Sequence, residues 1–206
     1  MQLPKIKIYT GKISEWTEIF ENEDKPETVC GRMLLLYGLL QRKEKCMFDK
    51  ADTPKEAYQI LKGLLKYGPH GKPDFRENRG IYFNISHSGM YAACALSEIP
   101  CGVDIEQIKE IRNQRIFEKV LSETEMRQVF SEKDKTAAFY KYWTRKESCL
   151  KLTGQGITVD LREVPRPIWH EDFVLQEDYA GCISADAECE VIYEQVFPTC
   201  LLKIFS

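Results

Sequence analysis

Apolar residues recur through much of the chain with the period of two that is typical of half-buried strands. In the first half these runs predict strands at 5–10, 81–86, 90–97 and 101–106. The second and third are joined by a polar turn at His-Ser-Gly 87–89, as in a hairpin. After Gly154, four shorter runs predict strands at 172–176, 179–185, 189–196 and 200–205.

Between these runs the apolar spacing changes to that of helices, and polar residues mark where several helices begin. Pro26 opens a run that ends in basic residues, both favourable placements for a helix. Thr53 with Glu56, and Ser122 with Glu125, have the spacing of a capping box. Helices are expected at 26–45, after Thr53, at 113–121, at 122–130 and from 135 to a left-handed stop at Gly154, whereas 67–73 predicts a turn.

Two stretches of the chain align without a gap. YAACALSEIPCGVDIE, from Tyr91, shares its Tyr, first Ala, both Cys, Val and final Glu with YAGCISADAECEVIYE, from Tyr179. A match this short also arises by chance, so duplication and coincidence are both open. A true duplication would make the protein a fused pseudo-dimer. Ile192 stands where the first copy has Asp104, so one site near the junction of the halves would follow.

Composition excludes several functional classes. The chain has 206 residues, 43% of them hydrophobic and 30% charged, which is typical of a soluble globular protein. Its net charge of −3 lacks the basic excess of nucleic-acid binders, and no apolar run approaches the length of a membrane span. The first ten residues show no signal peptide, and the eight cysteines include no C-x-x-C pair. We expect a cytoplasmic protein with reduced thiols and no nucleic-acid or membrane partner.

The stretch CGVDIE, 101–106, places two acids around one isoleucine. Residues two apart in a strand point to the same face, so Asp104 and Glu106 would stand side by side while Ile105 turns the other way. A solvated strand end would explain the pair without any function. Alternatively, two carboxylates on one face supply part of the oxygen ligand set that Mg²⁺ prefers.

A second group lies in WTRKESCLK, 143–151, where Glu147 and Lys151 are one helical turn apart. An exposed salt bridge on the helix surface would account for this spacing. The aromatic residues of FYKYW just before it indicate instead that the helix is largely buried. A buried glutamate needs a partner or a metal, so Glu147 could join the two acids, and Lys151 could neutralise phosphate charge beside them.

A third group lies in two neighbouring turns, where Lys72 precedes Pro73 and Ser86 precedes His87. Each could be an ordinary surface residue, but an ammonium, a hydroxyl and an imidazole together could bind a phosphate. Other chemistries fit less well. The cysteines lack the spacing of zinc ligands, the three histidines are scattered, and the motifs of serine hydrolases, P-loop enzymes and dinucleotide-binding proteins are absent from the sequence.

Taken in order, YGPHGKP, FNISHSGMYAACALSEIPCGVDIE and FYKYWTRKESCLKLTGQGI resemble the 4′-phosphopantetheinyl transferases of the surfactin-synthetase type. Each motif alone is weak, but the ordered set over 67–157 is specific. The resemblance implies an α+β fold built as a pseudo-dimer of two similar α/β halves, 1–106 and 107–206, with the active site in the cleft between them.

The resemblance also implies the reaction and the roles of the candidate residues. The phosphopantetheine arm of coenzyme A would be transferred to a serine of an apo acyl or peptidyl carrier protein, releasing adenosine 3′,5′-bisphosphate, by a monomeric enzyme. Asp104, Glu106 and Glu147 would hold Mg²⁺, and Lys151 would stabilise the leaving group. Coenzyme A would be bound by Lys151 together with Lys72, Ser86 and His87. The catalytic residues would be Glu147, Lys151 and Glu125, of which Glu125 aligns with a glutamate proposed as the base in some relatives. A metal-bound hydroxide or water is the alternative base.

Two other functions are compatible with the same residues. One is a catalytically silent protein that keeps the coenzyme A cleft, although such a protein would have no need of all three acids and Lys151. The other is a metal-dependent phosphohydrolase that uses the same carboxylates. The sequence also departs from the family where its N-terminal part is short and lacks the basic residues expected before the first long helix.

Overall fold

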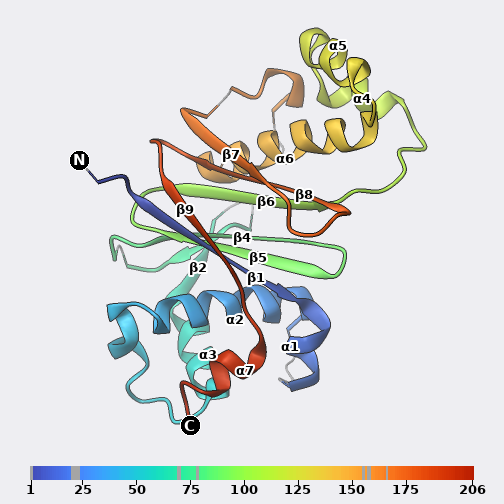
Figure 1. The fold of residues 1–206 in the computed structure, drawn as a ribbon. Coiled ribbons are helices and arrows are strands. Elements are labelled where there is room, and N and C mark those ends of the chain that lie inside the picture. Colours follow the sequence, from blue (N-terminus) through green and yellow to red (C-terminus); the bar gives the residue numbers. More distant parts are fainter. Residues whose placement is uncertain are drawn as a thin grey trace.

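The alternating and helical patterns fold into an α+β structure, seen in a computed structural model that describes residues 2–19, 24–68, 71–77, 79–154, 156, 159–165 and 167–206. Its described strands form a four-stranded sheet, a three-stranded sheet and a two-stranded ribbon. Figure 1 shows two long helices, α2 and α6, on opposite outer sides of the two larger sheets.

The first sheet has the strand order β4-β5-β1-β9. Its strands are β1 (Lys5–Lys12), β4 (Tyr82–Ser88), β5 (Tyr91–Ser97) and β9 (Glu190–Gln195). β9 lies parallel to β1, so a strand from near the end of the chain completes a sheet formed by the beginning. Helix α2 (Pro26–Leu40) covers the outer face, where the apolar run of its second half is buried in the larger hydrophobic core.

The second sheet has the order β6-β8-β7, with all neighbours antiparallel. Its strands are β6 (Cys101–Gln107), β7 (Trp169–Phe173) and β8 (Tyr179–Ala185). Helix α6 (Lys135–Thr153) packs on β6 and β8. The approach is close because Gly102 has no side chain: a Cβ there would lie 2.1 Å from the carbonyl oxygen of Ser148.

The two larger sheets pack face to face. Ile6 and Ile8 of β1 join Val103 and Ile105 of β6 in one buried cluster between them. The layers are therefore α2, first sheet, second sheet and α6, as Figure 1 shows. The remaining elements are α1 (Ile13–Ile19), η1 (Lys43–Phe48), α3 (Pro54–Leu64), β2 (Leu65–Tyr67), β3 (Pro73–Phe75), α4 (Arg115–Val120), α5 (Glu123–Ser131), η2 (Leu161–Glu163) and α7 (Pro198–Leu202).

An unusual seam joins the edge strands of the two sheets. Side chains of β4 accept hydrogen bonds from backbone N–H groups of β6, at an offset of nineteen residues. The acceptors are Asn84, Ser86 and Ser88, and the donors are Val103, Ile105 and Gln107, at 3.0, 3.3 and 3.1 Å respectively. The seam fixes β4 against β6 without a backbone ladder, and it places polar side chains of β4 beside the acids of β6.

Many predicted elements are confirmed. Both capping boxes form, with the hydroxyls of Thr53 and Ser122 accepting from the third residue of the following helix. Helix α6 ends as expected at Gly154, whose φ of 73° lies in the left-handed region that glycine adopts readily. Among the described residues, no helix combines the length and apolar character needed to span a bilayer.

Other boundaries differ from the prediction. The helix predicted over 26–45 ends at Leu40 and is followed by a 3₁₀ turn over Lys43–Phe48. The strand predicted at 200–205 is wrong, because Pro198 opens a short helix, α7, that buries Leu201 in the core.

Three further differences concern turns and strand positions. The strand predicted at 172–176 lies earlier, at Trp169–Phe173. The turn predicted at 87–89 is narrower, since His87 and Ser88 still belong to β4. The region of the predicted turn at 67–73 begins and ends in the short strands β2 and β3, while residues 69–70 lie outside the described part of the chain.

Candidate active site

Three carboxylates converge where β6 meets α6. The alternation predicted for β6 is confirmed: Ile105 is fully buried between the sheets, while Asp104 and Glu106 face the other way. Asp104 is only 3% exposed. From α6, whose close packing depends on Gly102, Glu147 is 9% exposed. The strand and the helix are far apart in the sequence, so only the tertiary fold could bring these acids together.

Lys151 and two serines tie the acids to β4. The Lys151 ammonium lies 2.7 Å from Asp104 Oδ1 and donates to Ser86 Oγ at 2.8 Å. Ser86 in turn donates to the same Asp104 oxygen at 2.9 Å. Ser88 donates to Glu106 Oε2 at 2.7 Å. The structure therefore brings Lys151 and Ser86 to the acids as one hydrogen-bonded group.

The electrostatics of the group show how strongly the acids interact. Burial raises the pKa of Glu147 to about 7, and the negative charge of Asp104 adds to the rise, while Lys151 partly opposes it and Glu106 supports it. Burial likewise raises the pKa of Glu106, with Asp104 contributing in the same direction. Glu106 and Glu147 therefore lie in a field of neighbouring negative charge, and such a field attracts a cation.

Two oxygens of the group are buried without any hydrogen bond: Asp104 Oδ2 and Glu147 Oε1. Leaving a buried acceptor unsatisfied is costly, and a divalent cation would satisfy both because carboxylate oxygens are the ligands that Mg²⁺ prefers. The donor chemistry therefore fits such an ion. Within the described residues, however, no three His, Cys, Asp or Glu side chains already form a metal-ligating group.

A cavity of about 490 Å³ opens beside Glu147 and Lys151. It extends along the last turns of α6 to Lys72 and Asn84, and Lys72 also borders a second cavity of about 390 Å³ between Tyr67 and Tyr82. The two cavities share Lys72, Pro73 and Gly154. We refer to these two adjoining cavities as the cleft; of the three acids, Glu147 lines it.

Lys72 and His87 lie outside the group of side chains that Asp104, Ser86 and Lys151 form. The Lys72 ammonium donates to the carbonyls of Lys151 and Leu152 and so caps the end of α6, and burial lowers its pKa. His87 is exposed, and alternation along β4 turns it to the opposite face from Ser86. Coenzyme A binding by these two residues stays a prediction.

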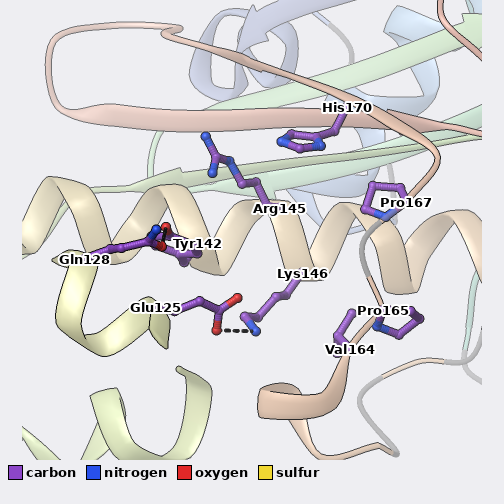
Figure 2. A pocket seen from close by; sticks show the side chains of 9 residues that line it. All are labelled: Glu125, Gln128, Tyr142, Arg145, Lys146, Val164, Pro165, Pro167 and His170. Carbon is purple, nitrogen blue, oxygen red and sulfur yellow. Dashed lines mark hydrogen bonds and ion pairs between the residues drawn. The ribbon is translucent and has the colours of Figure 1, made fainter. Parts of the chain in front are cut away.

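Glu125 lies in a separate cavity, shown in Figure 2, of about 270 Å³ between α5, α6 and β7. Its carboxylate forms an ion pair of 2.8 Å with Lys146, and both side chains are largely buried. Burial would raise its pKa, but the hydrogen bonds from Lys146 and Ser122 lower it overall. This cavity shares no lining residue with the one beside Glu147. The structure does not bring Glu125 to the other acids.

Sequence reasoning missed Ser88 and Lys146. A signal for Ser88 was present, because the polar residues of FNISHS recur at alternate positions and so lie on one face of a strand with Ser86. Lys146 gave no such signal, since a lysine next to a predicted ligand on a helix is ordinarily a surface residue. Its burial against Glu125 depends on how α5 packs on α6.

Comparison with known proteins supports the motif-based resemblance. Residues 100–193 match the family model described as the 4′-phosphopantetheinyl transferase superfamily. The chain is 37% identical to 4′-phosphopantetheinyl transferase Sfp of Bacillus subtilis over 109 residues, which are 50% of this chain and 48% of that protein. It is 38% identical to 4′-phosphopantetheinyl transferase psf-1 of Bacillus pumilus over 94 residues, 45% of this chain and 40% of that protein.

These two alignments span less than half the length of the curated relatives. A longer alignment joins the chain to 4′-phosphopantetheinyl transferase ffp of Bacillus subtilis, with 30% identity over 184 residues, 78% of this chain and 81% of that protein. The match to the family model includes Asp104, Glu106, Glu147 and Lys151. The chain therefore belongs to the 4′-phosphopantetheinyl transferase superfamily.

Proposed function

We propose that this protein transfers the 4′-phosphopantetheine arm of coenzyme A to a serine of an apo acyl or peptidyl carrier protein, releasing adenosine 3′,5′-bisphosphate. The observation that carries the proposal is the convergence of Asp104, Glu106, Glu147 and Lys151 beside a cleft, with two buried carboxylate oxygens unsatisfied. The names of the relatives support the same reaction class.

Asp104, Glu106 and Glu147 are the residues that would hold Mg²⁺. When bound, the ion would neutralise the charge of the diphosphate of coenzyme A, which is the main requirement of phosphoryl transfer. The unsatisfied oxygens of Asp104 and Glu147 support this assignment. The carboxylates repel one another in the absence of a cation, which also favours its binding.

The protein also contributes a positive charge to the site, the ammonium group of Lys151. Its ammonium is held by Asp104 and Ser86 and lines the cavity, so it is oriented before a substrate arrives. A fixed positive charge that meets the 5′-phosphate of the leaving adenosine 3′,5′-bisphosphate stabilises the transition state without reorganisation. Ser86 already donates to Asp104 and accepts from Lys151 and Ile105, so we assign it to orienting Lys151 as well as to the coenzyme A site.

The serine hydroxyl of the carrier must lose its proton during the transfer. Of the two glutamates predicted to take part in catalysis, Glu147 lines the cleft and Glu125 does not. We therefore propose Glu147 rather than Glu125 as the acceptor of this proton. Glu125 is already occupied by Lys146 and by the Ser122 N–H, which supports a role in fixing α5 against α6.

We also propose that the chain is a pseudo-dimer of related halves, 1–106 and 107–206. The strand pair β5 and β6 corresponds to β8 and β9 in the aligned stretches, and one long helix packs on each sheet. In this interpretation the halves exchange their last strands, since β6 joins β8 and β9 joins β1. Ile192 of β9 replaces the equivalent of Asp104, which accounts for a single site in the cleft between the halves.

In the proposed reaction the partners of the enzyme are coenzyme A, Mg²⁺ and a carrier protein. The enzyme itself would be a monomer that acts in the cytoplasm. All eight cysteines are free thiols, which fits a reducing compartment. The carrier itself, from a fatty-acid, polyketide or peptide pathway, is to be found by experiment.

The decisive experiment incubates the purified protein with coenzyme A, MgCl₂ and a panel of apo-carriers, and measures the mass of each carrier. We expect a gain of one phosphopantetheine on at least one carrier and none in EDTA. Binding of coenzyme A without any mass gain would favour the silent binder. Release of phosphopantetheine in the absence of a carrier would favour the phosphohydrolase.

A further inference from the structure

Ser88 occupies a position that the motifs do not explain. Its hydroxyl donates to Glu106 Oε2 at 2.7 Å and accepts from the backbone N–H of Gln107 at 3.1 Å. A hydroxyl has one proton, and the backbone N–H fills one of its lone pairs. The backbone bond therefore fixes the orientation of the hydroxyl, and its proton points at the Glu106 carboxylate.

The seam between β4 and β6 fixes where Ser88 stands. Asn84 and Ser86 form the same side-chain-to-backbone bond, to Val103 and Ile105, four and two residues earlier on each strand. Each is only 3% exposed. Ser88 is the last member of this row and lies next to the turn at Gly89, whose φ of 55° suits glycine. The buried part of the seam therefore sets the register in which Ser88 meets Glu106.

The two acids of β6 are restrained in different ways. Asp104 is short and is held by both Ser86 and Lys151. The Glu106 side chain has one more rotatable bond than that of Asp104 and is only half-buried. It therefore loses more conformational entropy when it is fixed in one position. The Ser88 hydroxyl supplies that restraint through Oε2, at 2.7 Å, and the indole of Trp143 also interacts with the Glu106 carboxylate.

We propose that Ser88 is a positioning residue that orients Glu106 for binding the divalent cation. This inference rests on the proposed function, because it requires that Glu106 be a ligand. Outer hydrogen bonds to metal ligands change metal affinity or activity by about 10- to 100-fold when they are removed. Ser88 thus links the register of β4 to the strength of metal binding.

Titration of Mg²⁺, and of Mn²⁺ as a second probe, into the metal-free protein by calorimetry tests the proposal. Ser88→Ala and Ser88→Val remove the hydroxyl, whereas Ser88→Thr keeps it. We expect the first two to bind either ion about tenfold more weakly or worse, and Ser88→Thr to bind like the wild type. Transfer by Ser88→Ala should recover when Mg²⁺ is raised, which a general loss of structure would not allow.

Ser97→Ala is a matched control. The Ser97 hydroxyl also accepts from a backbone N–H, that of Ile99, but it donates to the carbonyl of Lys5 instead of a carboxylate. Its loss should lower the melting temperature and leave metal affinity unchanged. If Ser88→Ala fails to fold, the metal affinities of Ser88→Val and Ser88→Thr can be compared instead. Valine and threonine are both β-branched and favour strands, and they differ in the hydroxyl.

The outcomes separate this inference from the proposed function. If the wild type binds the ions and Ser88→Ala and Ser88→Val bind them equally well, the positioning role is wrong and the metal site stands. If Ser88→Thr is as weak as Ser88→Val, the hydroxyl is not the cause and the positioning role is again wrong. A wild type that binds neither ion would overturn both proposals together.

Discussion

Glu147 carries a buried charge that the fold does not fully compensate. One of its oxygens is buried without a partner, and burial with the neighbouring acids raises its pKa from 4.5 to about 7. The folded state therefore binds a proton at Glu147 more readily than the unfolded state does between these two pH values. Stability gained from this proton is complete below pH 4.5 and is lost as the pH rises toward 7.

The first prediction concerns this loss. In EDTA, the free energy of unfolding of the wild type should fall by on the order of 3 kcal/mol between pH 4.5 and 7, relative to Glu147→Gln, whose neutral amide does not titrate. Denaturant titrations at several pH values measure the difference. The assigned pKa would be contradicted if the difference in free energy of unfolding between the wild type and Glu147→Gln stayed constant with pH. It would also be contradicted if the wild type became more stable relative to the variant as the pH rises.

The second prediction concerns Lys151. Lys151→Met keeps much of the side-chain length but removes the charge that meets Asp104 at 2.7 Å. Transfer to a carrier should fall by about 100-fold or more, as for the loss of other groups that stabilise transition-state charge, while the fold is retained. Initial rates with saturating coenzyme A, beside circular dichroism, check this; normal rates would remove Lys151 from the mechanism.

At the scale of elements, the packing of α6 decides whether the site exists. Its inner face places Glu147 and Lys151 against β6, and another face places Lys146 against Glu125 of α5. Helix propensity cannot choose between these faces. The choice follows from Gly102, which lets α6 approach β6, and from the apolar residues of α4, α5 and α6 that form a third core cluster.

The third prediction tests that approach. A Cβ at Gly102 would lie 2.1 Å from Ser148 O and 2.4 Å from Leu152 N, so Gly102→Ala must push α6 from β6 and separate Glu147 from Asp104. We expect a loss of about 3 kcal/mol or more in stability, and a larger loss of activity than of fold. Gly63→Ala in α3, where no atom lies within 4 Å of the new methyl, should instead be stabilising by about 0.5–1 kcal/mol.

The fourth prediction decides the role of Glu125. Glu125→Gln leaves Lys146 as a buried charge without its counterion, which should cost about 3 kcal/mol of stability. If Glu125 only fixes α5, the double variant Glu125→Gln/Lys146→Met should recover both stability and transfer. If Glu125 accepts the serine proton, the double variant should recover stability but stay about 100-fold slower or worse. Thermal melts and single-turnover rates separate the two.

At the scale of the whole molecule, the site lies where the two sheets meet. Strand β4 belongs to one sheet, β6 to the other and α6 covers the second, so three layers contribute to one group of side chains. Any ligand that binds there contacts both sheets and should hold them together. The stability of the entire protein is therefore expected to depend on metal.

The fifth prediction follows from this arrangement. Mg²⁺ at about 100 times its dissociation constant should stabilise the wild type by roughly 2.7 kcal/mol, and removal with EDTA should reverse the change. Asp104→Ala should fold, because it also relieves repulsion of Glu147, but should show no stabilisation by Mg²⁺. Equal shifts in melting temperature for the variant and the wild type would place the ion elsewhere.

The sequence alone determined the α+β class, most strands, both capping boxes, the end of α6 and the shared face of Asp104 and Glu106. These features depend on neighbours in the chain, because periodicity and caps report local geometry and which face is buried. The ordered motifs also gave the family. Local signals were insufficient at 200–205, where a strand was predicted. The structure has the helix α7 at Pro198–Leu202 instead, and Leu201 packs in the core.

Only the tertiary structure decided what each buried face packs against. Periodicity does not place β9 beside β1 or β6 beside β8, and it does not show that Ser88 meets Glu106. It also could not show that Lys72 caps α6 or that Glu125 has Lys146 as its partner. Such contacts join residues far apart in the chain, and their energies depend on the distances and burial that the packed layers impose.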